Sequence, residues 1–117
     1  MEAVSPRDEM QDVVRRKVLA LIGLGVRARN AVVGVEQVRV AAQRGRLALA
    51  VIASDVSQHS RDKILPLLKA RGIETVVGPT GDELGQSVGK QITAVVGIVD
   101  PALANGIRAA VSRTDGG

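Results

Sequence analysis

Hydrophobic residues recur along this chain in two patterns, one typical of helices and one typical of strands, and segments with the two patterns alternate. Between residues 10 and 24, apolar side chains return every three or four positions with basic residues between them, which is typical of a helix buried on one side. Between residues 47 and 53 every side chain is apolar, as in a strand covered on both faces of its sheet. Gly23 and Gly25 predict that the first helix ends near Leu24, because glycine is the commonest residue just past a helix.

The two patterns predict five helices and four strands in strict alternation, with a helix first and last. The predicted helices cover about residues 9–24, 35–44, 60–71, a short segment from residue 80, and 101–111. The predicted strands cover residues 32–33, 47–53, 74–77 and 93–99. Thr80 and Glu83 fit a capping box, and Asp100-Pro101 is a typical helix start. The predicted fold class is therefore α/β, a three-layer α/β/α sandwich with a central mixed sheet of about four strands.

The length of 117 residues predicts a single domain, with an ordered core over about residues 9–112 and flexible termini. The chain has no Phe, Trp or Tyr, so Val, Leu, Ile and Ala must form the core. The same absence excludes proteins that bind single strands by stacking bases on aromatic rings. Any RNA contact would depend on backbone amides, arginine, side-chain amides and aliphatic groups.

The formal charge of +4 is unevenly distributed, since residues 13–113 hold 15 Lys/Arg against seven Asp/Glu. A basic body favours polyanionic partners such as nucleic acid. The absence of cysteine excludes disulfides and thiolate metal sites and fits a reducing compartment, so we expect a cytoplasmic protein. No apolar run reaches the length of a membrane span, and no membrane partner is expected.

A glycine corner is the first candidate site. Val33, Gly34 and Val35 combine a strand end, a glycine turn and a helix N-terminus, where unpaired backbone N–H groups attract phosphate. Arg44 and Arg46, at the end of the same helix, are interpreted as charges that its dipole favours in any protein. Three other arginines in this part of the chain are candidates for phosphate contact: Arg27, Arg29 and Arg39.

Motifs that suggest enzyme chemistry do not meet the requirements of that chemistry. The sequence from Gly23 to Ala28 resembles a dinucleotide fingerprint but follows a helical pattern rather than a strand. The glycines between residues 78 and 90 lack the spacing of a phosphate-binding Walker loop. His59 and its neighbouring serines lie where helix caps are expected. The sequence therefore predicts no enzyme, no cofactor and no metal site.

Four segments carry a resemblance to a known family: GVEQVRVAAQRGRLALAVIASDVS, LPLLKARGI, GDELGQSVGK and AVVGIVDP. Over residues 18–111 the chain resembles the kink-turn RNA-binding ribosomal protein superfamily (the L-seven-Ae and L-thirty-e proteins), most of all its bacterial YlxQ-like branch. The resemblance implies an α/β/α sandwich. It also implies binding to a sharply bent RNA element that contains tandem sheared G·A pairs.

The family's binding pattern GxNExxK maps onto Gly34, Glu36, Gln37 and Val40, so only the glycine is retained. Glu36 can only accept hydrogen bonds, and Val40 supplies no charge for a phosphate. The family's second contact, a loop before the last strand, maps onto Gly89, Lys90, Gln91, Ile92 and Thr93. The predicted RNA-binding residues are Arg27, Arg29, Gly34, Glu36, Gln37, Arg39, Lys90, Gln91, Ile92 and Thr93.

The sequence thus predicts a non-enzymatic protein that binds structured RNA, with a link to the ribosome or to translation. It leaves open whether binding is specific for kink-turns or general for RNA. The alternative is a protein-interaction module on the same fold, either a homodimer or the partner of another protein, without RNA binding.

Overall fold

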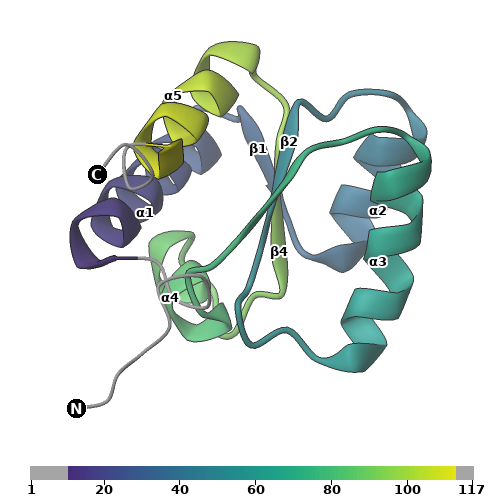
Figure 1. The fold of residues 1–117 in the computed structure, drawn as a ribbon, viewed down its shortest axis with the longest axis horizontal. Coiled ribbons are helices and arrows are strands. Elements are labelled where there is room, and N and C mark those ends of the chain that lie inside the picture. Colours follow the sequence, from purple (N-terminus) through teal and green to yellow (C-terminus); the bar gives the residue numbers. More distant parts are fainter. Residues whose placement is uncertain (1–10, 113–117) are drawn as a thin grey trace.

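The computed structural model describes residues 11–112, which fold into five helices and four strands (Figure 1). In chain order these are α1 Asp12–Arg27, β1 Ala31–Val33, α2 Val35–Gln43, β2 Leu49–Ile52, α3 Gln58–Ala70, β3 Thr75–Val77, α4 Gly81–Ser87, β4 Val95–Ile98 and α5 Pro101–Ser112. The strict alternation predicted from the hydrophobic periods is confirmed. The predicted helix start at residue 9 and the predicted flexible termini lie outside the described residues.

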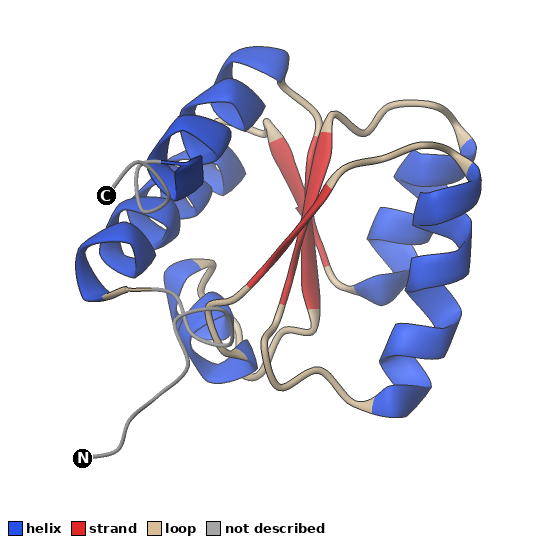
Figure 2. Cartoon of the chain, in the orientation of Figure 1, coloured by secondary structure: helices blue, strands red, loops and turns tan. Residues whose placement is uncertain are grey.

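The four strands form one mixed sheet in the order β1-β4-β2-β3. Strand β4 is antiparallel to both of its neighbours, β1 and β2, whereas β2 and β3 are parallel. Helices α1, α4 and α5 cover one face of the sheet and α2 and α3 cover the other (Figure 2). This arrangement is the α/β/α sandwich with a mixed sheet that the sequence predicts.

Alternate residues of the central strands supply two separate cores, because successive side chains of a strand point to opposite faces. Leu49 and Val51 of β2 pack with residues of α1 and α5, among them Ile22. Ala50 and Ile52 pack on the other face with residues of α2 and α3, among them Leu68. All four residues of β2 are therefore buried, as its uninterrupted apolar sequence predicts.

The predicted end of the first helix is wrong, because α1 continues through both glycines to Arg27. Gly23 and Gly25 are buried where α1 contacts other helices. A Cβ on Gly25 would lie 2.3 Å from Cδ2 of Leu103, and one on Gly23 would lie 3.1 Å from the carbonyl oxygen of Ser87. These glycines allow close helix packing rather than a helix end.

The topology gives the sheet two distinct ends. Strands β1, β2 and β3 all finish at one end, where β4 begins, and the Gly34 N–H donates to the Val95 carbonyl there at 2.9 Å. At the other end, the Val99 N–H donates to the Asn30 carbonyl at 2.9 Å and the Ala50 N–H donates to the Glu74 carbonyl at 3.0 Å. We call these ends the Gly34 edge and the Asn30 edge.

Candidate nucleic-acid interface

Gly34 forms the corner between β1 and α2. Its φ of 95° lies in the left-handed region, which favours glycine. Helix α2 begins there without a side-chain cap, whereas side chains cap α3, α4 and α5: Ser57, Thr80 and Asp100. An uncapped helix start presents backbone N–H groups and the positive end of the helix dipole. At the glycine corner predicted from the sequence, the first N–H groups of α2 therefore have no side-chain cap.

The predicted contact residues of α2 differ in how exposed their side chains are and in whether those side chains already have a partner. Glu36 and Gln37 are exposed on the first turn of α2, and Val40 is exposed one turn later. Arg39 is half-buried, and its Nη1 donates to the carbonyl oxygen of Lys63 at 2.6 Å. That hydrogen bond joins α2 to α3, so Arg39 has a structural role in addition to any contact with phosphate.

The loop between α4 and β4 lies at the same edge as Gly34. Lys90, Gln91 and Ile92 are exposed, and the Ile92 side chain is 78% exposed despite being apolar. Thr93 is buried at 4% exposure, and its N–H donates to the carbonyl oxygen of Gly81 at 2.9 Å. Thr93 therefore anchors the loop, while the three preceding side chains are accessible.

Gly85 fixes the path of this loop. The Lys90 N–H donates to the Gly85 carbonyl at 2.8 Å, so the loop folds back over α4. A Cβ at residue 85 would lie 1.2 Å from the carbonyl oxygen of Gln91. Only glycine leaves room for the backbone that presents Lys90 and Ile92.

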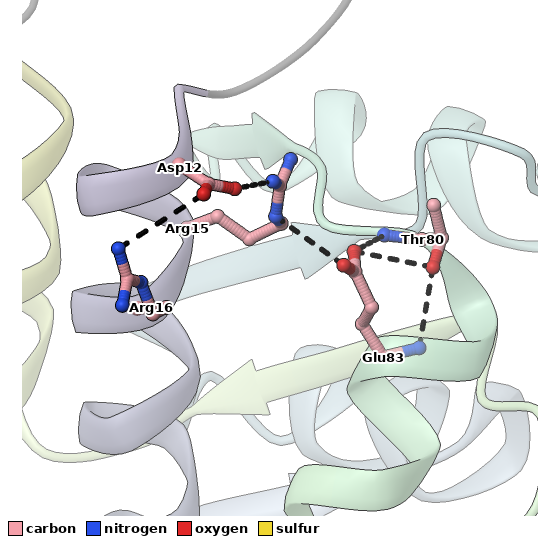
Figure 3. Close-up of polar contacts among 5 residues, drawn as sticks. All are labelled: Asp12, Arg15, Arg16, Thr80 and Glu83. Carbon is pink, nitrogen blue, oxygen red and sulfur yellow. Dashed lines mark hydrogen bonds and ion pairs between the residues drawn. The ribbon is translucent and has the colours of Figure 1, made fainter.

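Helix α4, which carries this loop, is held in place by a polar network (Figure 3). Thr80 Oγ1 accepts from the Glu83 N–H at 3.2 Å, and Glu83 Oε1 accepts from the Thr80 N–H at 3.0 Å, which is the predicted capping box. Arg15 of α1 pairs with both Glu83, at 3.3 Å, and Asp12. The network therefore links α1 to the start of α4.

Replacing Thr80 with alanine is expected to lower the free energy of unfolding by about 1 kcal/mol, because the helix loses its N-cap hydroxyl. Urea unfolding followed by circular dichroism would measure the change, since the chain has no aromatic residue to report by fluorescence. Thr80→Ser keeps the hydroxyl and should retain most of the stability. Equal losses in both variants would contradict a capping role.

Asp55 also helps to hold α4 in place, a role that the sequence did not reveal. Its Oδ1 accepts from the Gly81 N–H at 2.8 Å, so the loop between β2 and α3 also caps α4. No local pattern could identify this contact, because the two residues lie 26 positions apart in the sequence. The hydrogen bond holds two loops of the Gly34 edge together.

Two of the predicted arginines lie away from the glycine corner. Arg29, with a φ of 64°, precedes β1 at the Asn30 edge, one strand length from Gly34. Arg27 is the last residue of α1, and its Nη1 lies 3.8 Å from the Cβ position of Gly23, beside Ser87 of α4. The structure thus gathers six of the ten predicted residues as accessible groups at the Gly34 edge: Gly34, Glu36, Gln37, Lys90, Gln91 and Ile92.

The charges at the Gly34 edge are unusual for a surface that would bind phosphates. The segments that form it are residues 34–37, 53–57, 78–82 and 89–94. They contain three carboxylates, on Glu36, Asp55 and Asp82, and one cation, on Lys90. Any phosphate contact at this edge must therefore depend mainly on backbone N–H groups and Lys90.

Other kinds of site are not evident in residues 11–112. Within them, no group of three or more His, Asp or Glu side chains is placed to hold a metal ion. None of the helices described there is long and apolar enough to cross a membrane. An apolar cavity of about 500 Å³ lies between α1 and α5, lined by Val13, Val14 and Leu21 among others, outside the segments of the Gly34 edge.

The fold and the glycine corner place this chain in the class of α/β/α sandwich proteins. Comparison with known proteins identifies its family within that class. Residues 16–107 match the model of the Ribosomal protein L7Ae/L30e/S12e/Gadd45 family, so the chain belongs to that family. No curated protein matches the sequence significantly.

Solved structures with the same fold include two that are matched over nearly their whole length. A protein of unknown function from Bacillus halodurans is 32% identical with a TM-score of 0.75, over 82% of this chain and 97% of that one. A Giardia lamblia 15.5kD RNA binding protein is 21% identical with a TM-score of 0.73, over 97% of this chain and 98% of that one. At 21% identity the second likeness establishes a shared fold.

Proposed function

We propose that this chain binds structured RNA of the kink-turn type through its Gly34 edge. The observation that carries the proposal is the 2.9 Å hydrogen bond from the Gly34 N–H to the Val95 carbonyl. It joins the corner before α2 to the first residue of β4, which follows the loop of Lys90 and Ile92, and this supports a joint surface of the two contact regions that the family resemblance implies. Family membership and the fold shared with an RNA binding protein support the assignment.

Each accessible group at the Gly34 edge suits a different part of an RNA. Backbone N–H groups of α2 and the Lys90 ammonium suit phosphate oxygens, which position an RNA without reading its sequence. Gln37 can both donate and accept hydrogen bonds at base edges, whereas Glu36 can only accept them. The exposed Ile92 side chain suits apolar contact with an unstacked base.

The finer parts of the proposal concern biological context. We infer a non-enzymatic role linked to the ribosome or to translation, in the cytoplasm, within the YlxQ-like branch of the family. The resemblance to that branch and the absence of any motif for catalysis support this inference. The RNA partner would then be a structured element, ribosomal RNA included.

A titration against two RNAs tests the proposal. Filter binding would compare a kink-turn RNA with an unbent duplex of equal length, at low and at moderate salt. We expect the kink-turn to remain bound at moderate salt, because contacts to its bent shape add to the salt-sensitive phosphate contacts.

Equal and salt-sensitive binding of the two RNAs would contradict kink-turn specificity and leave a general RNA binder. Absence of binding at either salt would favour the alternative, a protein-interaction module on the same fold. Sedimentation analysis of the oligomeric state would then be the next measurement.

A further inference from the structure

The positive charge of this protein is concentrated at the Asn30 edge. The segments that form this edge are residues 28–30, 44–48, 69–74 and 99–101, which are brought together by the strand ends. They contain five exposed cations and two carboxylates, the opposite balance to the Gly34 edge. The five cations are Arg29, Arg44, Arg46, Lys69 and Arg71.

Both carboxylates of the Asn30 edge already have partners. Glu74 Oε1 pairs with Nε of Arg108 at 2.5 Å, and Asp100 Oδ2 accepts from the Leu103 N–H at 2.8 Å. Among residues 11–112, no ion pair or hydrogen bond engages the side chains of the five cations. Their charge is therefore available to an external anion.

Two matching turns present four of these cations. Helices α2 and α3 follow the parallel strands β1 and β2, so both helices end at the Asn30 edge. Each ends in an Arg-Gly pair whose glycine is left-handed, with φ of 68° at Gly45 and 65° at Gly72. Arg44 and Arg46 belong to the first turn, and Lys69 and Arg71 to the second.

These side chains do not cap the ends of α2 and α3. The last carbonyls of α2 accept from the backbone N–H groups of Arg44, Gly45 and Arg46 at 2.9–3.1 Å. The last carbonyls of α3 accept from residues 71, 72 and 73 in the same way, at 2.9–3.0 Å. Backbone N–H groups thus satisfy three carbonyls at each helix end, and no guanidinium group of residues 11–112 donates a hydrogen bond to these carbonyls.

The chemistry of the five cations at the Asn30 edge favours binding to the phosphates of a polyanion. Four of the five cations are arginines, whose planar guanidinium groups bind phosphate oxygens in pairs. A membrane surface usually receives apolar side chains as well as charge, and none of the exposed large hydrophobic residues described lies in these four segments. Nucleic acid needs no such apolar anchor.

We propose that the Asn30 edge is a second RNA-contact surface that binds the phosphate backbone of a stem different from the one at the Gly34 edge. The proposal rests on the RNA-binding function proposed above. Because the two edges lie at opposite ends of the strands, a stem seated at Gly34 leaves the Asn30 edge facing away from it. The protein then bridges two RNA stems, one recognised by shape and one held by charge.

The test uses the full chain with two labelled RNAs. A kink-turn RNA carries the donor dye, and a short unbent duplex carries the acceptor, so energy transfer reports a complex that contains both. The test variant changes Arg44, Arg46, Lys69 and Arg71 to Gln. The control variant makes the same change in net charge elsewhere, at four cations outside the Asn30 edge: Arg16, Lys17, Arg61 and Lys63. Circular dichroism checks that both variants fold.

The wild-type protein and the control variant should give energy transfer, and the test variant should lose it while still binding the kink-turn RNA. Its affinity for the unbent duplex should fall at least about tenfold, with a salt dependence shallower by about 0.9 in slope for each phosphate that is no longer neutralised. Equal loss in both variants, or bridging retained in the test variant, would overturn the proposal. Failure of the function proposed for the Gly34 edge would appear separately, as kink-turn binding no tighter than duplex binding in the wild type.

Discussion

Replacing Gly85 with alanine is expected to lower the free energy of unfolding by about 3 kcal/mol, at the upper end of the usual cost of overpacking. The added Cβ would lie 1.2 Å from the Gln91 carbonyl oxygen and 2.4 Å from its carbon. These atoms belong to the backbone, so no side-chain rotation relieves the overlap, and the loop itself must move. Movement of the loop would displace Lys90 and Ile92, and we expect kink-turn affinity to fall as well.

Gly106→Ala is the matched control for this change. Gly106 also lies inside a helix, but a Cβ there would meet only the Leu21 side chain, at 3.7 Å and 4.0 Å. Alanine should therefore stabilise the protein by up to about 1 kcal/mol, through its higher helix propensity. Urea unfolding of both variants by circular dichroism measures the contrast. Unchanged stability in Gly85→Ala would show that the loop is not constrained by α4.

Restoring the family's binding pattern is expected to raise kink-turn affinity by about thirtyfold, which corresponds to about 2 kcal/mol. The variant combines Glu36→Asn, Gln37→Glu and Val40→Lys. Asparagine can both donate and accept at the sheared base pairs, the carboxylate moves to residue 37, where the family's pattern has it as an acceptor, and lysine adds a phosphate contact. All three positions are exposed on α2, so the fold should be unaffected.

Val13→Lys is the control for added charge. It gives the same net change of one positive charge as the triple variant, at a residue of α1 that is 72% exposed. Filter binding should show little gain in kink-turn affinity for this control. The affinity of both variants for the unbent duplex should rise only by the small amount that one added positive charge gives. An equal gain in both variants would mean that the pattern on α2 does not determine recognition.

The fold was predictable because each element carried its own signal in the sequence. The buried strand β2 follows from seven consecutive apolar residues, and α4 and α5 follow from Thr80 with Glu83 and from Asp100 with Pro101. The end of α1 was not predictable, because the role of Gly23 and Gly25 depends on Ser87 and Leu103 in distant helices. A glycine that ends a helix and one that admits a neighbouring helix look the same in the sequence.

The candidate site was predictable where its parts are local. The Gly34 corner combines its strand end and helix start in three residues, so the sequence alone indicates it. The separation of Arg29 from Gly34 was predictable in the same way, because Arg29 precedes the predicted strand that Gly34 follows and so lies beyond its other end. The contribution of Asp55 and the gathering of Arg46 with Arg71 depend on strand order, which no local pattern encodes.

The central position of β4 has a consequence for how the chain folds during its synthesis. Strands β1 and β2 do not pair with each other, since both pair with β4, whose residues 95–98 are made long after those of β1. At translation rates of about 5–20 residues per second, β1 waits several seconds for its partner. Until then β1 has no strand to pair with, so the four-stranded sheet can be completed only after most of the chain has been made.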